Sequence, residues 1–457
     1  MFIKKINVNS YRGLNNLEIN FSQPSYKYFG NLKLSVIVGE NGVGKSTLFK
    51  FLVTKFSSQN FKQDRDEPRG EIEYEVDGDG YLLKASSEHP KAYPSKVIVS
   101  SFSAFDPYDL YVLTKNKVEE NKIITSKYIH VGPSDRGFSS FDNVIAAIME
   151  LLFVLNVRKQ KYDIYYNLLN KIKIKRAEGI LINYDRLREI HRRNSREHFQ
   201  DFEGSEQFKV LISEFLEIVM NIKRSHSHRA YKSLFGNIQY RSNNILVPID
   251  IFEKEILGIY LEYLKFDYGD PLIRDIIFLN ETNNYVFLSE MSSGEITMLF
   301  RFLPLIKEIE DNSIILIDEP ETHLHPRWTR EFISYIDSLF SGYKVHVMIA
   351  THSPVIASDV PMECIIGLKN KNGCIEQYKP KDRTLGGDSS QLLLDVFELQ
   401  NLESIGALKV IDKINELLGK SQPNSREIGE ARQLYQDLSS TIEKYELYKM
   451  YKEFLGD

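Results

Sequence analysis

The stretch that decides the fold is VIVGENGVGKSTLFK, residues 36–50 of the chain. Its first residues are apolar, as in a buried strand, and a helical pattern begins at the Lys-Ser-Thr that ends the Gly-rich loop. Residues 39–46 fit the pattern GxxxxGK[ST] in full, and both flanks have the form that this motif requires. The sequence therefore predicts a P-loop, which holds the phosphates of a nucleoside triphosphate.

The residue types of this loop suit phosphate and metal binding. Glycines let backbone N–H groups approach the phosphates, and the N-terminus of the following helix adds a favourable dipole. Lys45 is expected to reach the β- and γ-phosphates, and the Ser46 hydroxyl is expected to ligate Mg²⁺, so ATP and Mg²⁺ are the expected cofactors. The predicted nucleotide-binding residues of the loop are Gly39, Asn41, Gly42, Gly44, Lys45, Ser46 and Thr47.

A second stretch, IILIDEP at residues 314–320, ends a predicted buried strand in two carboxylates. Asp318 is expected to hold the metal, since a carboxylate can bind Mg²⁺ through its water shell. Glu319 follows directly and is placed to polarise an attacking water as a general base. An acidic surface turn is the plain alternative. Beside a P-loop the pair favours an enzyme that hydrolyses ATP, with Lys45 and Glu319 as catalytic residues.

A short polar motif, MSSGE at residues 291–295, precedes a helical pattern, and alone it predicts a helix cap. Because the motif lies shortly before Asp318, however, it resembles the LSGGQ or LSGGE signature of the ABC-type ATPases. Met291 stands in place of the leucine, and a serine replaces the first glycine. The resemblance implies a site for the γ-phosphate of a nucleotide held by another subunit. Its residues are Ser292, Ser293, Gly294 and Glu295.

The stretch IATHSP, residues 349–354, again follows a predicted buried strand. In the ABC-type family this position holds the switch histidine, which contacts the γ-phosphate and the attacking water. The resemblance implies that His352 is a third catalytic residue; a purely structural histidine is the plain alternative. One chain carries only one set of these motifs, so the resemblance implies a head-to-tail homodimer or a higher oligomer.

Two further motifs narrow the resemblance. DEPETHLHP at residues 318–326 and Tyr11-Arg12-Gly13 are similar to motifs of the RecF/OLD-like, SMC-related ATPases. The implied fold class is α/β: a P-loop NTPase with an ABC/SMC-like head, an antiparallel β subdomain, a helical insertion and a C-terminal helical tail. Arg12 would then lie close to the nucleotide, and an exposed arginine on a hairpin is an equal alternative.

One departure concerns a glutamine that ABC proteins usually place after the strand that follows the P-loop, where it senses Mg²⁺. Residues 64–159 contain no glutamine. Ser101, Ser103 and Asp106 are the candidates to replace it, and the sequence does not choose among them.

The pattern along the chain predicts four parts. Residues 1–141 form the N-terminal lobe of the head, whose first hairpin turns at Asn15-Asn16. Residues 142–264 form a helical insertion, because apolar residues recur there at helical spacing. Residues 265–385 return to a β pattern as the C-terminal lobe, and residues 386–457 form a helical tail.

The composition bounds the cellular setting. With 42% hydrophobic and 26% charged residues the chain fits a soluble globular protein, and two cysteines are too few for a disulfide framework. No apolar run is long enough for a membrane span. We expect a cytoplasmic protein that does not associate with a membrane.

Nuclease motifs are missing from the sequence, which has no DxD after His352 and no HNH-type histidine cluster. It also lacks the CxxC hook that a Rad50-like protein needs. A lone ATPase head of this kind resembles the stand-alone ATPase subunits of bacterial anti-phage defence systems, nearest the Septu type. The resemblance implies a regulatory or sensor subunit that works with a separate HNH-type nuclease. The alternative is a RecF-like repair or recombination ATPase that binds DNA itself.

A basic segment, Arg158–Arg196, contrasts with the net charge of −5 of the whole chain. Its cationic residues alternate with tyrosines, among them Tyr162 and Tyr184. Three interpretations stay open: a solvated helix face, a weak sequence-independent nucleic-acid site, or a contact with an acidic protein surface.

Overall fold

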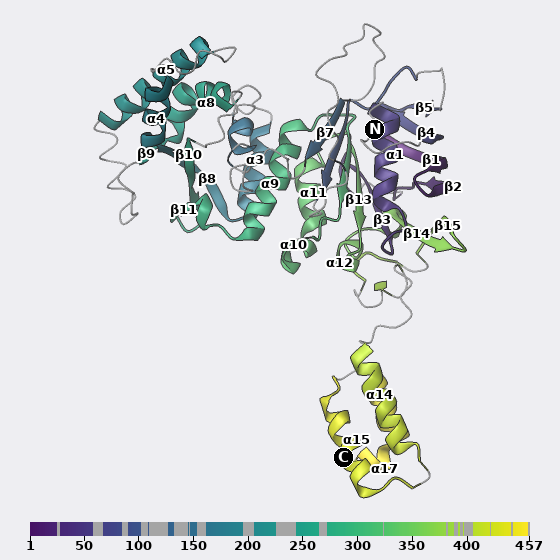
Figure 1. Ribbon diagram of the computed structural model, residues 1–457. Coiled ribbons are helices and arrows are strands. Elements are labelled where there is room, and N and C mark those ends of the chain that lie inside the picture. The colour runs from purple at the N-terminus through teal and green to yellow at the C-terminus, as the bar shows by residue number, and fades with distance from the viewer. Residues whose placement is uncertain are drawn as a thin grey trace. The chain divides into compact units, whose positions relative to one another are not determined.

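The computed structural model divides the chain into two compact units, Met1–Ser389 and Ser390–Asp457 (Figure 1). The residues that it describes are 1–24, 28–57, 67–84, 90–101, 108, 127–131, 145, 147–152, 161–194, 205–224, 244–264, 272–322, 324–380, 383–387, 392–393, 396, 405–420, 422–439 and 442–455.

A seven-stranded sheet forms the centre of the first unit, with the strand order β15-β14-β3-β13-β12-β6-β7. Neighbouring strands run parallel, except for the antiparallel pair β14 and β15. The inner strands are continuous apolar runs because both faces of the sheet are covered. The strands are β3 (Lys33–Gly39), β6 (Lys96–Ser101), β7 (Lys127–Val131), β12 (Ile314–Asp318), β13 (His346–Thr351), β14 (Ile365–Lys371) and β15 (Cys374–Tyr378).

Each face of this sheet has its own cover (Figure 1). Helix α1 (Lys45–Ser57) and a second, antiparallel sheet lie on one side, and their apolar side chains form one core with the central strands. Helices α9 (Ser293–Glu308) and α11 (Phe332–Phe340) lie on the other side. The second sheet has the order β2-β1-β4-β5, with strands β1 (Phe2–Tyr11), β2 (Leu14–Asn20), β4 (Arg69–Val76) and β5 (Asp79–Leu83).

The first hairpin is present, but its turn was predicted three residues too late. The chain turns at Arg12-Gly13, where φ is +46° and +88°, and not at Asn15-Asn16. Two successive left-handed residues are what a two-residue hairpin loop needs, and Gly13 meets that need better than asparagine. The second hairpin turns at Asp77-Gly78, a residue pair that two-residue hairpin loops favour.

A buried histidine ties the two sheets of the first unit together. His346 Nδ1 accepts a hydrogen bond from the Ile3 N–H at 3.1 Å, and its Nε2 lies 2.9 Å from Ser35 Oγ. Because Nδ1 accepts, the proton of the neutral ring is on Nε2 and is donated to the serine. The rings of Phe2 and Phe21 pack on the imidazole. Burial lowers the pKa of His346 to about 3.

Acid is expected to destabilise the protein through His346. The pKa of 6.5 in the unfolded chain means that the unfolded state takes up a proton below that pH, whereas the folded state does not. The contribution of neutral His346 to the free energy of unfolding is therefore fully present above pH 6.5, and it is lost as the pH falls towards 3. At about pH 5 the free energy of unfolding should have dropped by about 2 kcal/mol through this group.

Urea unfolding at about pH 7.5 and about pH 5 measures this loss. The control is His346→Asn, which keeps an acceptor for the Ile3 N–H and does not titrate. The variant should lose about 2 kcal/mol less than the wild type between the two pH values. An equal loss in both proteins would show that His346 does not cause the acid sensitivity.

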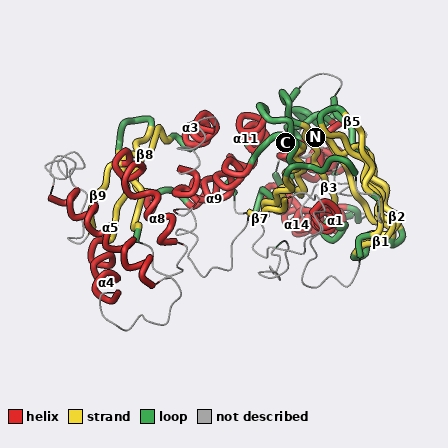
Figure 2. The backbone as a smooth tube through the Cα atoms, turned by 90° about the horizontal axis from the view of Figure 1, so that it is seen from above, coloured by secondary structure: helices red, strands yellow, loops and turns green. Residues whose placement is uncertain are grey.

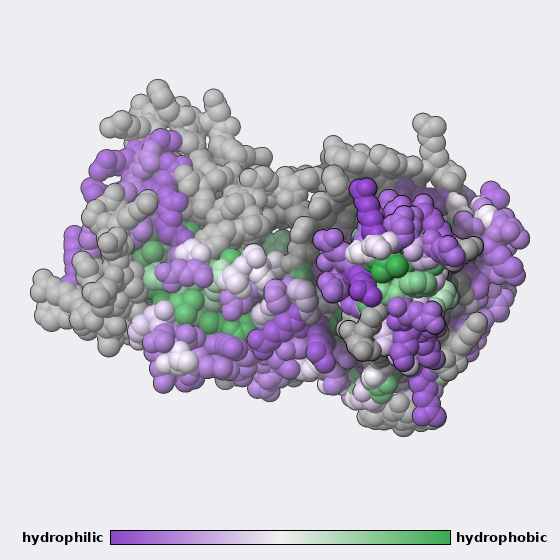
Figure 3. Space-filling view, turned by 90° about the horizontal axis from the view of Figure 1, so that it is seen from below, coloured by the Kyte–Doolittle hydropathy of each residue, from purple (hydrophilic) through white to green (hydrophobic). Residues whose placement is uncertain are grey.

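A third sheet, with the order β11-β10-β8-β9, forms an α/β lobe at residues 161–290. Its helices α4, α5 and α8 pack together over one face of the sheet (Figure 2). The other face carries Leu181, Leu246 and Ile277 with Tyr285 and Phe287, and apolar surface is visible on the lobe from below (Figure 3). The elements are α3 (Tyr162–Lys171), β8 (Ile174–Asn183), α4 (Tyr184–Asn194), α5 (Ser205–Arg224), β9 (Asn244–Pro248), α7 (Ile249–Ile251), the π-helix η3 (Phe252–Ile256), α8 (Leu257–Leu264), β10 (Ile273–Asn280) and β11 (Tyr285–Phe287).

The prediction of a helical insertion at residues 142–264 differs from the structure in two ways. First, the strands β8 and β9 lie inside this range. The sequence pattern missed them because periodicity alone does not tell a short apolar run, such as residues 180–182, from part of a helix. Second, the boundary at residue 264 separates strands of one sheet, since β10 pairs with β8 in an antiparallel ladder. The lobe ends with the short helix η4 (Leu288–Glu290) that leads into the signature motif.

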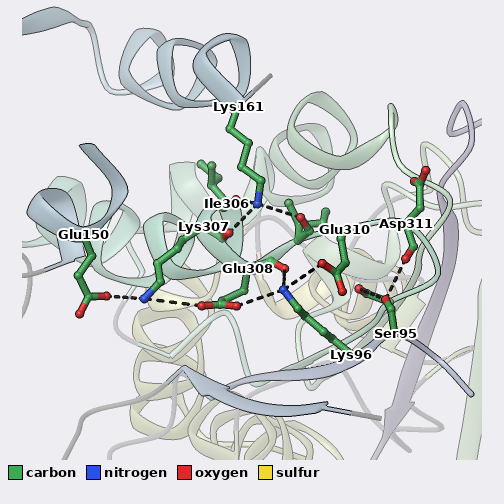
Figure 4. Close-up of polar contacts among 11 residues, drawn as sticks. Ser95, Lys96, Glu150, Lys161, Ile306, Lys307, Glu308, Glu310 and Asp311 are labelled. Atoms are coloured by element: carbon green, nitrogen blue, oxygen red, sulfur yellow. Dashed lines mark hydrogen bonds and ion pairs between the residues drawn. The ribbon is translucent and has the colours of Figure 1, made fainter. Parts of the chain in front are cut away.

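A buried lysine closes the C-terminal end of α9 (Figure 4). Lys161 Nζ donates to the carbonyl oxygens of Ile306 at 2.8 Å, Lys307 at 2.6 Å and Ile309 at 2.9 Å. The last carbonyl groups of a helix have no partner within the helix, so these three bonds satisfy groups that would otherwise be buried and unpaired. Lys96 Nζ adds ion pairs to Glu308 and Glu310 at 3.2 Å each, which fasten α9 to the start of β6.

Replacing Lys161 with Met is expected to lower the free energy of unfolding by about 3 kcal/mol, because it leaves buried carbonyl groups unsatisfied. The side chain of Lys161 is only 5% exposed, so water cannot easily replace the ammonium group. Urea unfolding is the measurement. The exposed Lys371 is the matched control, and Lys371→Met should stay within about 0.5 kcal/mol of the wild type. Equal values for the two variants would refute this role.

The remaining short helices of the first unit connect the strands of the central sheet. They are α10 (Pro326–Arg330), α12 (Pro354–Ala357) and the 3₁₀ helix η5 (Met362–Cys364). The second unit is helical and has a core of its own, built around Ile414, Leu417 and Leu447. Its helices are α14 (Ile405–Leu418), α15 (Ser425–Asp437), α16 (Ile442–Met450) and α17 (Lys452–Leu455). Among the helices described, none is both long and apolar enough to cross a membrane.

Candidate nucleotide-binding site

The P-loop joins β3 to α1, and its glycines Gly39 and Gly44 are required by close packing against backbone and by a left-handed conformation, respectively. A Cβ at Gly39 would lie 2.3 Å from the carbonyl oxygen of Leu368, so no side chain fits there. A Cβ at Gly44, whose φ is +88°, would lie 2.6 Å from the Leu14 side chain. Thr47 is in the first turn of α1. The loop thus presents the N-terminus of a 13-residue helix, which suits an anion.

The lysine of the P-loop is folded back over its own loop. Lys45 Nζ donates to the carbonyl oxygens of Gly39 at 2.9 Å and Glu40 at 3.1 Å, and it lies 2.6 Å from His352 Nε2. Burial lowers the pKa of Lys45 to about 8, although the charges of Asp318 and Glu319 oppose this shift. The ammonium group is therefore held where nearby phosphate oxygens could replace its present acceptors.

The predicted metal ligands Asp318 and Ser46 are brought together. Asp318 ends β12, is 2% exposed and lies close enough to the Ser46 side chain for the two groups to interact. Its Oδ1 is buried and has no hydrogen-bond partner among the described residues. A buried carboxylate oxygen without a partner is costly, and a cation or its water shell would satisfy it. The donor set of one carboxylate and one hydroxyl fits Mg²⁺.

A tyrosine completes this carboxylate site, and the sequence did not predict it. Tyr108 is buried, and its hydroxyl donates to Asp318 Oδ2 at 2.7 Å. Burial raises the pKa of Asp318, while the hydrogen bonds from Tyr108 and Ser46 oppose the rise. Of the three candidates to replace the missing glutamine, Ser103 and Asp106 lie outside the described residues. The backbone carbonyl of Ser101 accepts a bond from Arg301 of α9.

The predicted base, Glu319, and the predicted switch histidine, His352, lie side by side. Glu319 has a left-handed backbone with φ of +49°, and its N–H donates to the Ala350 carbonyl at 2.8 Å. Its carboxylate Oε1 lies 3.9 Å from His352 Nε2. Burial, and then the charge of Lys45, lowers the pKa of His352 to about 4, so the imidazole is neutral at neutral pH. Strain of this kind in a glutamate is typical of a functional site.

The signature motif caps its helix and stands apart from this cluster. The Ser292 Oγ accepts from the Glu295 N–H at 3.3 Å, and the Glu295 carboxylate accepts from the Ser292 N–H at 2.8 Å. In the described part of the chain these two residues bond to each other and to none of the P-loop or Asp-Glu residues. Ser292 and Ser293 are exposed, and a Cβ at Gly294 would lie 3.3 Å from Trp328 Nε1.

Arg12 lies in the β1–β2 turn, which packs against the P-loop through Leu14. Its guanidinium lies 5.9 Å from the centre of the Tyr11 ring. The turn thus brings Arg12 near the loop, and a role at the nucleotide stays a prediction.

The basic segment is distributed over α3, β8 and α4, so it is not one helix face. On α4 the charge is partly neutralised, since Arg186 and Arg193 both pair with Glu189. The guanidinium of Arg188 lies 5.5 Å from the centre of the Tyr184 ring. Arg158 and Arg196, which bound the segment, lie outside the described residues.

The structure thus gathers Lys45, Ser46, Asp318, Glu319 and His352 at the carboxyl ends of three adjacent parallel strands, β3, β13 and β12. This edge is where open α/β sheets bind their ligands. The arrangement can hold a phosphate chain, a divalent cation and a water in one place.

Comparison with known proteins gives relatives of low identity. Protein ea59 of Escherichia phage lambda is 23% identical over 86% of this chain and 59% of its own length. The "Retron Vc95 probable ATPase" of Vibrio cholerae serotype O1 biovar El Tor is 20% identical over 93% of this chain and 89% of its own. The Septu protein PtuA of Bacillus mycoides (strain KBAB4) is 24% identical over 43% of this chain and 29% of its own.

This chain therefore spans less than two thirds of the length of ea59 and of PtuA. The similarity to the Septu and retron proteins agrees with the resemblance to defence ATPases that the motifs imply. Among solved structures, the SMC head domain from Thermotoga maritima is 12% identical at a TM-score of 0.36, over 84% of this chain and 100% of that one.

The family model described as "AAA domain, putative AbiEii toxin, Type IV TA system" matches residues 34–359, which include the P-loop, the signature motif, the Asp-Glu pair and His352. The match covers well over half of the chain. The chain therefore belongs to this AAA-domain family.

Proposed function

We propose that this chain hydrolyses ATP with Mg²⁺, and that it is the regulatory ATPase subunit of a cytoplasmic anti-phage defence complex. One observation carries the first part: Lys45 Nζ, the carboxylates of Asp318 and Glu319 and the imidazole of His352 converge at one edge of the central sheet. The names of the retron and Septu relatives support the second part.

The residues of the site divide the work of hydrolysis between them. When ATP binds, Lys45 Nζ gives up its hydrogen bonds to the Gly39 and Glu40 carbonyls and donates to the β- and γ-phosphate oxygens instead. Ser46 and Asp318 would hold Mg²⁺, which supplies charge neutralisation on the phosphates. Glu319, about one-third exposed, takes the proton of the attacking water. Neutral His352 lies between Lys45 and Glu319 and orients the γ-phosphate and the water.

A second subunit would complete the site. The exposed Ser292 and Ser293 lie at the N-terminus of α9, whose orphan N–H groups and dipole favour a phosphate. Among the described residues of one chain they bond to no residue of the P-loop, so we assign them to the nucleotide of a partner copy in a head-to-tail dimer.

The effector is proposed to be a separate nuclease of the HNH type. The helical unit Ser390–Asp457, with its own core, is a suitable docking element because it forms a compact body. The test of this docking site is to co-express the neighbouring gene product with a chain lacking residues 390–457 and to pull down that shortened chain. Retention of the nuclease by the shortened chain would exclude the unit as the docking site.

Release of inorganic phosphate from ATP by the purified chain, with Mg²⁺ and then with EDTA, tests the enzymatic part of the proposal. We expect steady turnover that stops when EDTA removes the metal. Turnover that persists in EDTA would exclude the Asp318–Ser46 metal site, and no turnover in either buffer, with nucleotide bound, would leave a nucleotide-binding protein without ATPase activity.

A further inference from the structure

The turn after the Asp-Glu pair places a second, buried carboxylate beneath the switch histidine. Glu321 Oε1 accepts the backbone N–H of His352 at 2.6 Å, and its Oε2 accepts the hydroxyl of Thr351 at 2.8 Å. The contact is possible because β12 and β13 are adjacent and Asp318 pairs with Ala350, so the two turns that follow these strands meet. Burial raises the pKa of Glu321, and the two hydrogen bonds oppose the rise.

We propose that Glu321 is a positioning residue for the proposed ATP hydrolysis: its two oxygens fix the Thr351-His352 peptide and hence the place of the imidazole. Glu321 does not touch the reacting atoms in this arrangement. It acts through His352, whose Nε2 lies 2.6 Å from Lys45 Nζ and 3.9 Å from Glu319 Oε1. This inference rests on the proposed function.

The position of His352 matters because the histidine lies between the cation and the base. A displacement of about 1 Å in a catalytic group can lower a rate by about 100-fold. The Thr351 hydroxyl is also fixed from the other side, since it accepts the Ser353 N–H at 2.9 Å. Glu321 therefore fixes a turn in which three successive residues, Thr351 to Ser353, are bonded through side chain or backbone.

Two conservative variants separate the reach of the side chain from its charge. Glu321→Gln keeps the length: its carbonyl oxygen can accept the His352 N–H, and its amide can donate to Thr351 Oγ. Glu321→Asp keeps the charge but withdraws the carboxylate by one methylene, so it cannot span both partners. If Glu321 acts by positioning His352, Glu321→Asp should hydrolyse ATP more slowly than Glu321→Gln.

The experiment measures kcat and KM for ATP in the full-length protein, with thermal unfolding as a check of folding. We expect Glu321→Asp to lower kcat by about 10- to 100-fold with KM changed by less than about threefold. Glu321→Gln should keep kcat within about threefold of the wild type. Loss of kcat in Glu321→Gln equal to or larger than that in Glu321→Asp would overturn the inference, because charge and not reach would then matter.

The His352→Ala variant distinguishes failure of this inference from failure of the proposed function. If His352→Ala turns over ATP as fast as the wild type, the proposed role of the switch histidine fails. If His352→Ala loses activity while Glu321→Asp keeps it, only the positioning role of Glu321 fails. Loss in both, with Glu321→Gln active, supports the inference.

Discussion

Replacing Glu319 with Gln is expected to lower kcat for ATP hydrolysis by about 100- to 10,000-fold while nucleotide binding is kept. Glutamine has the same shape but cannot accept a proton from the attacking water. The left-handed backbone at Glu319 and its N–H bond to Ala350 do not depend on the carboxylate charge, so the site should keep its geometry. Because bound ATP is no longer consumed, the variant should also accumulate the proposed dimer.

Phosphate release gives the rate, and equilibrium binding of ATP gives the affinity. The control is Glu363→Gln, which removes the charge of an exposed glutamate on η5 and should leave both values unchanged. If Glu319→Gln protein hydrolysed ATP at the wild-type rate, Glu319 would not be the base.

Replacing Lys45 with Ala is expected to weaken ATP binding by about 100- to 1,000-fold, which corresponds to the loss of a buried charge pair. The ammonium group is the cation of the P-loop and lies beside the Gly39 and Glu40 carbonyls that the phosphates would replace. Lys33→Ala is the matched control, because Lys33 is exposed at the opposite end of β3. An affinity that survives Lys45→Ala would place the phosphates elsewhere.

The pKa of Lys45 adds a pH dependence of known sign. With a pKa of about 8, the lysine of the free protein is protonated below pH 8 and neutral above it. Phosphate binds the charged form, so ATP binding above pH 8 requires proton uptake. The affinity should therefore be constant below pH 8 and fall by up to tenfold per pH unit above it.

The sequence predicts the parts of the site that depend on local motifs. Asp318 ends a buried strand, and Lys45 and His352 come after one. Parallel strands carry their ends to one edge of the sheet, so the cluster can be expected before the structure is known. Tyr108 and Glu321 could not be identified in the same way. Tyr108 meets Asp318 across 210 residues, and no local pattern marks that pairing.

The α/β lobe shows a second limit of sequence patterns. Residues of α3 and α4 repeat at helical spacing, whereas β8 is only a short apolar run between them. Its strand character is decided by pairing with β9 and β10, which lie far away along the chain. Tertiary pairing thus decides what periodicity leaves open.

Complementation between two inactive variants tests the central claim, that ATP is hydrolysed at a site shared by two copies of this chain. Lys45→Ala removes the P-loop cation. Ser293→Arg places a large side chain on the exposed first turn of α9 and leaves the Ser292–Glu295 capping box in place.

The measurement is phosphate release by each variant alone and by an equal mixture after subunit exchange. Each variant alone should be nearly inactive. After random exchange, about half of the head-to-tail dimers contain one copy of each variant. In such a mixed dimer one site carries both substitutions and the other site carries none. The mixture should therefore reach about a quarter of the wild-type rate. A mixture no more active than its components, or a fully active Ser293→Arg protein, would contradict the shared site.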